Sequence, residues 1–159
     1  MNGKPAAAGL PTDQLISLDD VRIRLARVWL IGAGVIFVLL VVQSLLHVYG
    51  DLTQDAWGWF LPNLMPSLGM IISVLAYTAL DPLSSRAMVR RTFVQIAEWL
   101  SLIYLLLVLL TILMQPFSAG SAAERVALMH TSNLWLGPVQ GLVASALGVL
   151  FVSKKKRES

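Results

Sequence analysis

The sequence predicts an all-α integral membrane protein of four transmembrane helices packed as an antiparallel bundle, with both termini cytoplasmic. Hydrophobic residues make up 57% of the 159-residue chain and charged residues only 13%, and the mean hydropathy is +0.73. This composition is too apolar for an ordinary soluble domain. Four apolar runs approach or exceed the ~20 residues that a helix needs to cross a bilayer. The runs are joined by short connections, which makes consecutive helices antiparallel neighbours.

The basic residues predict the orientation of the bundle. All but one of the 12 Lys and Arg residues fall in the N-terminal arm, the second connection or the C-terminal tail, and the exception is Arg125 in the third connection. Lys and Arg accumulate on the cytoplasmic side of membranes, so these three segments are expected there. We expect the bacterial inner membrane as the location. Because the basic residues serve as topology signals, the net charge of +3 does not indicate a nucleic-acid partner.

We divide the chain into a disordered N-terminal arm at 1–16, a basic amphipathic helix at 17–27, a transmembrane bundle at 28–153 and a basic cytoplasmic tail at 154–159. Ser17 can cap the amphipathic helix, and its Arg residues suit the cytoplasmic surface of the bilayer. In an equally weighted alternative, this segment simply extends the first membrane helix. The bundle contains four spans, which we place at 28–48, 60–80, 93–114 and 134–152.

The ends of the spans carry two further signals. Ser121 and Glu124 have the spacing of a capping box, in which two side chains and two backbone N–H groups pair at a helix start. This predicts a short outer helix from about Ala122 that leads into the fourth span. Aromatic residues near the span ends are typical of interfacial belts, and we assign to these belts Trp29, Tyr49, Trp57, Trp59, Tyr77 and Trp135.

Prolines mark the outer entrances of the second and fourth spans. Proline suits the first turn of a helix, and Pro62 is placed there. Pro66 cannot donate to the carbonyl of Pro62, so either this turn is distorted or the regular helix begins only at Pro66. "WFLP" in the second span is matched by "WLGP" in the fourth. We favour plain helix starts, with an outer vestibule as the alternative; its residues are Trp59, Pro62, Asn63, Pro66, Trp135 and Pro138.

Small residues recur in the first and fourth spans, in the fourth at near-helical spacing. Small residues let membrane helices approach closely. We interpret them as packing positions within one bundle or between copies of the chain. The residues are Gly32, Gly34, Gly137, Gly141, Ser145 and Gly148.

The third span contains an acidic residue, Glu98, with Gln95 and Ser101 three residues to either side. This spacing places the three on one helical face. An ionisable group inside a membrane is costly and is by default a functional hypothesis. Glu98 can pair with a nearby arginine (Arg86, Arg90 or Arg91), line a pore, or act as a proton-coupled carboxylate. We favour the ion pair because the shallow depth allows the side chain to reach the interface.

Cofactor and enzyme chemistry are not expected. The chain has no cysteine and only two histidines, which excludes disulfides and thiolate metal sites. His47 and His130 are interpreted as interfacial residues, and we assign no metal, cofactor or catalytic residue. The sequence contains no GxSxG, HExxH, P-loop or paired-carboxylate pattern, so we expect no enzyme.

Three functions are compatible with this reading. The first is a small oligomeric membrane subunit that anchors, senses for or regulates a partner protein. The second is a homo-oligomeric channel or pore with a proline-shaped outer vestibule. The third is a proton-coupled transporter that uses Glu98. The scarcity of polar residues along any one helical face favours the subunit. Its expected partners are the lipid bilayer, further copies of the chain and a possible second protein.

Overall fold

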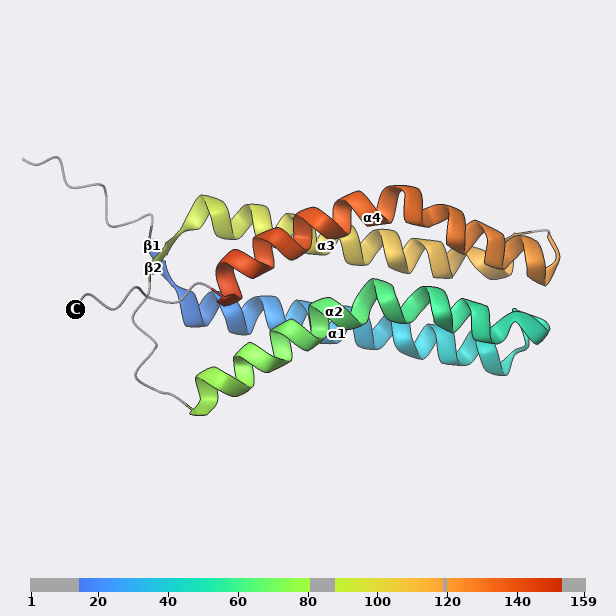
Figure 1. Ribbon diagram of the computed structural model, residues 1–159, viewed down its shortest axis with the longest axis horizontal. Coiled ribbons are helices and arrows are strands. Elements are labelled where there is room, and N and C mark those ends of the chain that lie inside the picture. The colour runs from blue at the N-terminus through green and yellow to red at the C-terminus, as the bar shows by residue number, and fades with distance from the viewer. Residues whose placement is uncertain (1–14, 81–87, 119, 153–159) are drawn as a thin grey trace, which may run out of the picture.

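The computed structural model describes residues 15–80, 88–118 and 120–152. In these ranges the chain forms four long helices, α1 (Leu18–Leu45), α2 (Thr53–Leu80), α3 (Arg91–Met114) and α4 (Ala122–Val152). All four are long and apolar enough to cross a membrane (Figure 1). The expected all-α class, with four helices long and apolar enough to span a membrane, is confirmed.

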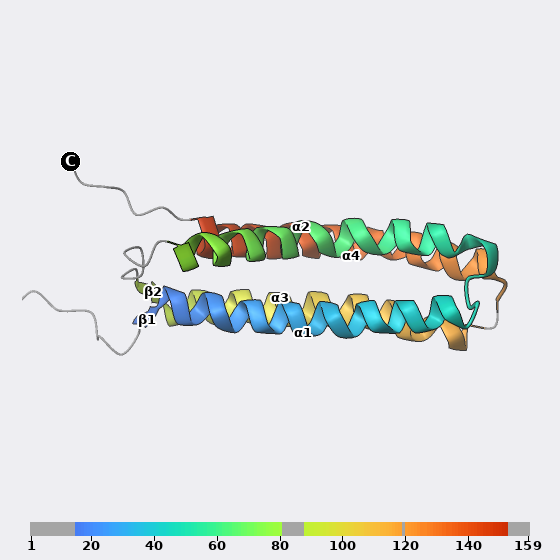
Figure 2. The same cartoon turned by 90° about the horizontal axis from the view of Figure 1, so that it is seen from below.

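The helices lie lengthwise in two layers, with α1 and α3 in one and α2 and α4 in the other (Figure 2). We call the end that carries the strands β1 (Leu15–Ser17) and β2 (Met88–Arg90) the ribbon end. The end that carries the 3-10 turns η2 (Gly50–Leu52) and η4 (Gln115–Phe117) is the turn end. The two strands pair antiparallel. Towards the ribbon end, the last turns of α2 lean away from the other helices (Figure 1).

Three helices begin well before the positions that the sequence indicated, among them α2, which starts at Thr53. α1 is continuous from Leu18, so residues 18–27 form its first turns and the alternative reading describes them. Ser17 belongs to β1 and makes no side-chain cap hydrogen bond, so the expected cap was wrong. Residues 15 and 16, which we had placed in the disordered arm, belong to β1. The tail at 154–159 and most of the arm lie outside the described residues. α4 likewise runs without a break from Ala122, so no separate outer helix precedes the fourth span.

The capping box at the start of α4 is confirmed. The backbone N–H of Ser121 donates to Glu124 Oε2 at 3.0 Å, and the N–H of Glu124 lies 3.4 Å from Ser121 Oγ. The first N–H groups of a helix have no acceptor within it. This reciprocal pairing provides acceptors for two backbone N–H groups at the start of α4.

The core between the helices is filled by large side chains. Trp29, Tyr49 and Trp59 are among the most deeply buried residues, so the expectation that they form interfacial belts was wrong. Trp29 packs on Tyr104 with ring centroids 5.9 Å apart. Tyr77 and Trp135 are exposed and can still serve in belts. Burying an indole between helices gains dispersion contacts that neighbouring lipid would not supply as densely.

Arginine side chains join the helices near their ends. At the ribbon end, buried Arg22 donates from Nε to the carbonyl of Leu150 at 3.0 Å and from Nη2 to that of Phe151 at 3.2 Å. The last carbonyls of a helix have no partner within it, so Arg22 of α1 caps the end of α4. At the turn end, Arg125 donates to the carbonyl of Val48 at 2.8 Å.

Candidate functional site

Both prolines of α2 lie inside the helix, so the expectation that Pro62 begins it was wrong, and the helix does not begin at Pro66 either. Because a proline nitrogen carries no hydrogen, Pro66 cannot donate to the carbonyl of Pro62. In the hydrocarbon region no water can replace the missing donor, so the carbonyl requires a partner from the protein.

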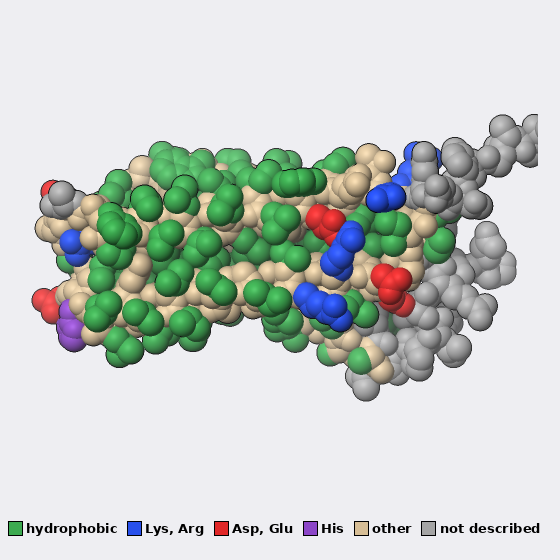
Figure 3. Space-filling view, turned by 180° about the vertical axis from the view of Figure 1, so that it is seen from behind, with side chains coloured by type: hydrophobic (Ala, Val, Ile, Leu, Met, Phe, Trp, Pro, Cys, Tyr) green, Lys and Arg blue, Asp and Glu red, His purple; other side chains and the backbone are tan. Residues whose placement is uncertain are grey.

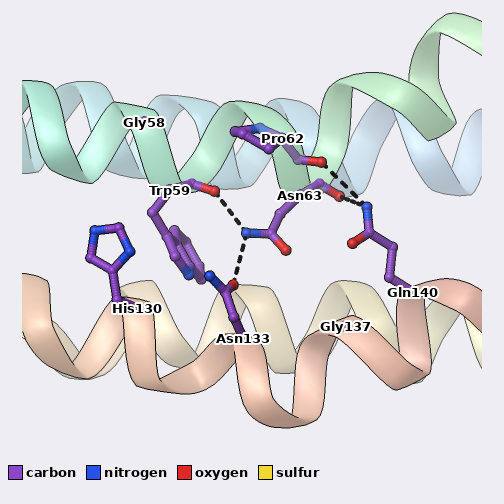
Figure 4. A pocket seen from close by; sticks show the side chains of 8 residues that line it. All are labelled: Gly58, Trp59, Pro62, Asn63, His130, Asn133, Gly137 and Gln140. Carbon is purple, nitrogen blue, oxygen red and sulfur yellow. Dashed lines mark hydrogen bonds between the residues drawn. The ribbon is translucent and has the colours of Figure 1, made fainter.

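Gln140 of α4 supplies this donor. Its Nε2 lies 3.3 Å from the carbonyl oxygen of Pro62 and 3.2 Å from that of Asn63 (Figure 4). A neighbouring helix therefore satisfies a backbone group that α2 cannot satisfy itself. This explains how α2 continues through Pro66 without an unpaired carbonyl at Pro62.

Asn63 connects three helices at this level. Its Nδ2 donates to the carbonyl of Trp59 at 2.7 Å and to Asn133 Oδ1 of α4 at 3.3 Å. The hydroxyl of Tyr104 on α3 donates to the carbonyl of Asn63 at 2.7 Å. Hydrogen bonds between membrane helices contribute about 0.6 kcal/mol on average. The cluster therefore ties α2, α3 and α4 together in a defined register.

Part of this cluster opens onto the surface as a hollow of about 240 Å³, which we call the α2–α4 groove. In Figure 4 the indole of Trp59 extends from α2 towards α4 and lies between His130 and Asn133. Trp59 is only 2% exposed, and its Nε1 has no hydrogen-bond partner within the described part of the chain. The lining combines hydrogen-bond donors, acceptors and glycine backbone. Its residues are Gly58, Trp59, Pro62, Asn63, His130, Asn133, Gly137 and Gln140.

Comparisons with protein-family models, with curated proteins and with solved structures gave no match. The function is therefore argued from the residues of the chain alone.

The residues of the predicted vestibule are divided between the groove and the outside of the bundle. Trp59, Pro62 and Asn63 line the groove. Trp135 and Pro138 are exposed on α4 and do not line it. Pro66 is exposed one turn further along α2. The matched "WFLP" and "WLGP" motifs thus have different surroundings, because only the tryptophan of the first points into the bundle.

The polar stripe of α3 is divided in the same way. Gln95 is exposed and Ser101 is completely buried. Glu98 forms an ion pair with Arg24 of α1, so the expected type of contact is present with a different partner from Arg90 or Arg91; Arg86 lies outside the described residues. None of the stripe residues lines the α2–α4 groove.

Of the small residues, only Gly32 makes the close intrachain contact that we expected of such positions. A Cβ placed on Gly32 would lie 2.9 Å from Leu105 Cδ1 of α3, so a side chain there would push α1 and α3 apart. By contrast, a Cβ at Gly34, Gly137, Gly141 or Gly148 would meet nothing within 4 Å. Ser145 is exposed as well. The stripe on α4 is therefore open and does not pack within the chain.

Sequence reasoning missed Tyr104 and Asn133 as members of the cluster and gave no joint role to His130 and Gln140. One signal was available, because positions 130, 133, 137 and 140 follow helical spacing and share a face of α4. Tyr104 offered no such signal, because its hydroxyl reaches α2 only through the packing of α3. No group of three metal-ligating side chains occurs in the described ranges.

Proposed function

We propose that the chain is a non-conducting integral membrane subunit that anchors or regulates a partner by binding it through the α2–α4 groove. The observation that carries this proposal is an uncharged polar groove on the outside of two helices apolar enough to span a membrane. Polar groups that face lipid have no partners there. A protein docked on the groove would satisfy them, so the groove is the natural contact surface.

The proposed topology is an antiparallel bundle in the bacterial inner membrane with the ribbon end, and both termini, in the cytoplasm. The support is the distribution of charge. Near the ribbon end, the face seen in Figure 3 carries several basic side chains together with acidic ones. Arg24 and Arg27 are exposed in the first turns of α1. The turn end carries Arg125 together with Asp51 in η2, Asp55 in the first turn of α2 and Glu124 in the first turn of α4. This asymmetry follows the positive-inside rule.

The channel and the transporter remain alternative predictions with less support. A pore requires a continuous polar path. The space between the helices of one copy holds Trp29, Tyr104 and other buried apolar residues, so the pore would have to lie between copies. A proton-coupled carboxylate must reach a substrate, whereas Glu98 is paired with Arg24 and lies away from the groove. Neither feature favours transport through a single copy.

The proposal is tested in two steps. The purified chain in liposomes should give no ion or proton flux above that of empty vesicles. In native membranes, a photoreactive residue at Ala144, exposed on the groove side of α4, should yield discrete cross-links to protein. The same group at Leu106, which is 61% exposed on α3, is the matched control and should cross-link to lipid only.

A flux that Asn63→Leu abolishes would replace this proposal with the pore. Flux that is lost in Glu98→Gln would instead favour the transporter. Equal protein cross-linking from Ala144 and Leu106 would remove the groove as the contact surface.

A further inference from the structure

The groove belongs to a longer surface with almost no side chains. On α2, Gly58, Pro62 and Gly69 recur at helical spacing, and on α4, Gly137 and Gly141 do the same. All of them are exposed. A Cβ at any of these four glycines would meet nothing within 4 Å. The backbone of another helix can therefore approach this surface closely, as small residues allow in membranes.

The same surface combines carboxamides that bond within the chain with one polar atom that has no partner among the described residues. Trp59 Nε1 is buried at the base of the groove without an acceptor among the described residues. Asn133 is exposed at the rim, and Gln140 is only partly covered. Acyl chains offer neither donors nor acceptors. An occupant with polar groups can therefore add hydrogen bonds at the exposed carboxamides, which lipid cannot.

Charge favours an identical copy as the occupant. None of the eight residues that line the groove is Asp, Glu, Lys or Arg, so two such faces can meet without like-charge repulsion. Carboxamides both donate and accept, which makes Asn133 and Gln140 complementary to themselves across a two-fold axis. Near the ribbon end, the face seen in Figure 3 instead carries charged side chains of both signs, and the ion pair of Arg24 and Glu98 joins α1 to α3.

We propose that two copies of this chain form a parallel, two-fold symmetric dimer through the α2–α4 face, with α4 crossing α4 near Gly141. Gly137, Gly141 and Ser145 form a small-xxx-small series, which permits two identical helices to cross closely. This inference rests on the proposed function, which assigns protein docking to the groove, and it names the second copy as the docked protein.

Disulfide trapping tests the contact directly, because the chain has no cysteine of its own. Ser145→Cys in native membranes should give a disulfide-linked dimer on mild oxidation, because Ser145 is exposed beside the crossing point. Ile103→Cys, at a 46% exposed position of α3, is the control and should stay monomeric. Equal cross-linking of both variants, or none at Ser145→Cys, would overturn the proposal.

A pair of glycine variants tests the energetics. Gly141→Ile should weaken association of the purified protein at least tenfold. A mass measurement in bilayer discs should then show monomer in place of dimer. Gly34→Ile on α1 is the matched control: it adds the same side chain at an equally open helical glycine, and it should leave the dimer intact. The melting temperature of each variant checks that it folds.

A wild-type chain that is monomeric in bilayer discs at every protein-to-lipid ratio would also overturn the proposal. If Ala144 still cross-links to protein in native membranes in that case, the groove binds a different protein and the proposed function stands. If both experiments fail, lipid covers the groove and the proposed function fails with the dimer.

Discussion

The ribbon end and the α2–α4 groove differ in the charge of their polar side chains. At the ribbon end the polar groups are charged and find their partners within the chain. Arg22 caps the carbonyls at the end of α4, and Arg24 pairs with Glu98 of α3. In the groove the polar groups are uncharged. Asn63, Asn133 and Gln140 are hydrogen-bonded within the chain, while the Nε1 of Trp59 has no acceptor in the described ranges.

This difference separates structural from interaction chemistry. A buried charge costs several kcal/mol unless it is paired, so a chain that contains one must supply the partner itself. An uncharged indole N–H costs less to leave without a partner than a charge does. The groove can therefore contain one such group without losing much stability. We accordingly expect the ribbon end to contribute more to stability, and the groove more to association.

The largest expected effect comes from Arg22→Ala. The change removes two charge-assisted hydrogen bonds and leaves the carbonyls of Leu150 and Phe151 without that donor. We expect the free energy of unfolding in detergent to fall by about 3 kcal/mol. Arg27→Ala, at an exposed position of the same helix, should change it by less than about 0.5 kcal/mol. Equal effects would mean that the ribbon end is not held by Arg22.

Gln140→Leu should lower the free energy of unfolding by a smaller amount, about 1.5 kcal/mol. The reason is that the carbonyl of Pro62 loses its donor from α4. Thermal unfolding measures the change. Gln95→Leu is the control, since Gln95 is an exposed glutamine on α3, and it should be near neutral. A neutral Gln140→Leu would show that α2 tolerates its prolines without help from α4.

The pH dependence of stability tests an uncharged contact of Tyr49 at the turn end. Its hydroxyl donates to Gln43 Oε1, and burial raises the pKa of Tyr49 to about 12, while the charge of Arg125 acts in the opposite direction. The unfolded chain releases this proton near the ordinary value of about 10. The contribution to stability is therefore complete below pH 10 and is lost as the pH rises towards 12.

Tyr49→Phe should lower stability by about 1 kcal/mol at pH 8 because the hydrogen bond is lost. Between pH 10 and 12, the stability of the variant should fall less steeply than that of the wild type. Parallel pH profiles for the two proteins would contradict the assignment.

The smallest effect is expected for the pair of Arg24 and Glu98, whose side chains are 57% and 22% exposed. A double-mutant cycle with Arg24→Gln and Glu98→Gln should give a coupling of about 0.5 kcal/mol. The coupling should shrink in 1 M salt because an exposed pair is screened. A coupling that does not respond to salt would place the pair in a dry environment and blur the contrast with the groove.

Much of the fold was predictable from local properties. Four apolar runs predicted four helices, because a chain in lipid must satisfy its backbone hydrogen bonds within each segment. The capping box at Ser121 and Glu124 predicted the start of α4, since its partners are three residues apart. The start of α2 was not predictable, because the prolines are compatible with a helix interior only when another helix supplies a donor.

The sequence by itself determined the class of the protein, the number of spans and the end of each span that carries basic residues, because these depend on composition along one helix. Only the tertiary structure decided which polar residues meet. Gln140 reaches Pro62, and Tyr104 reaches Asn63, across gaps of 78 and 41 positions in the chain. Contacts of that separation depend on how the helices pack and rotate, which no periodicity within one helix specifies.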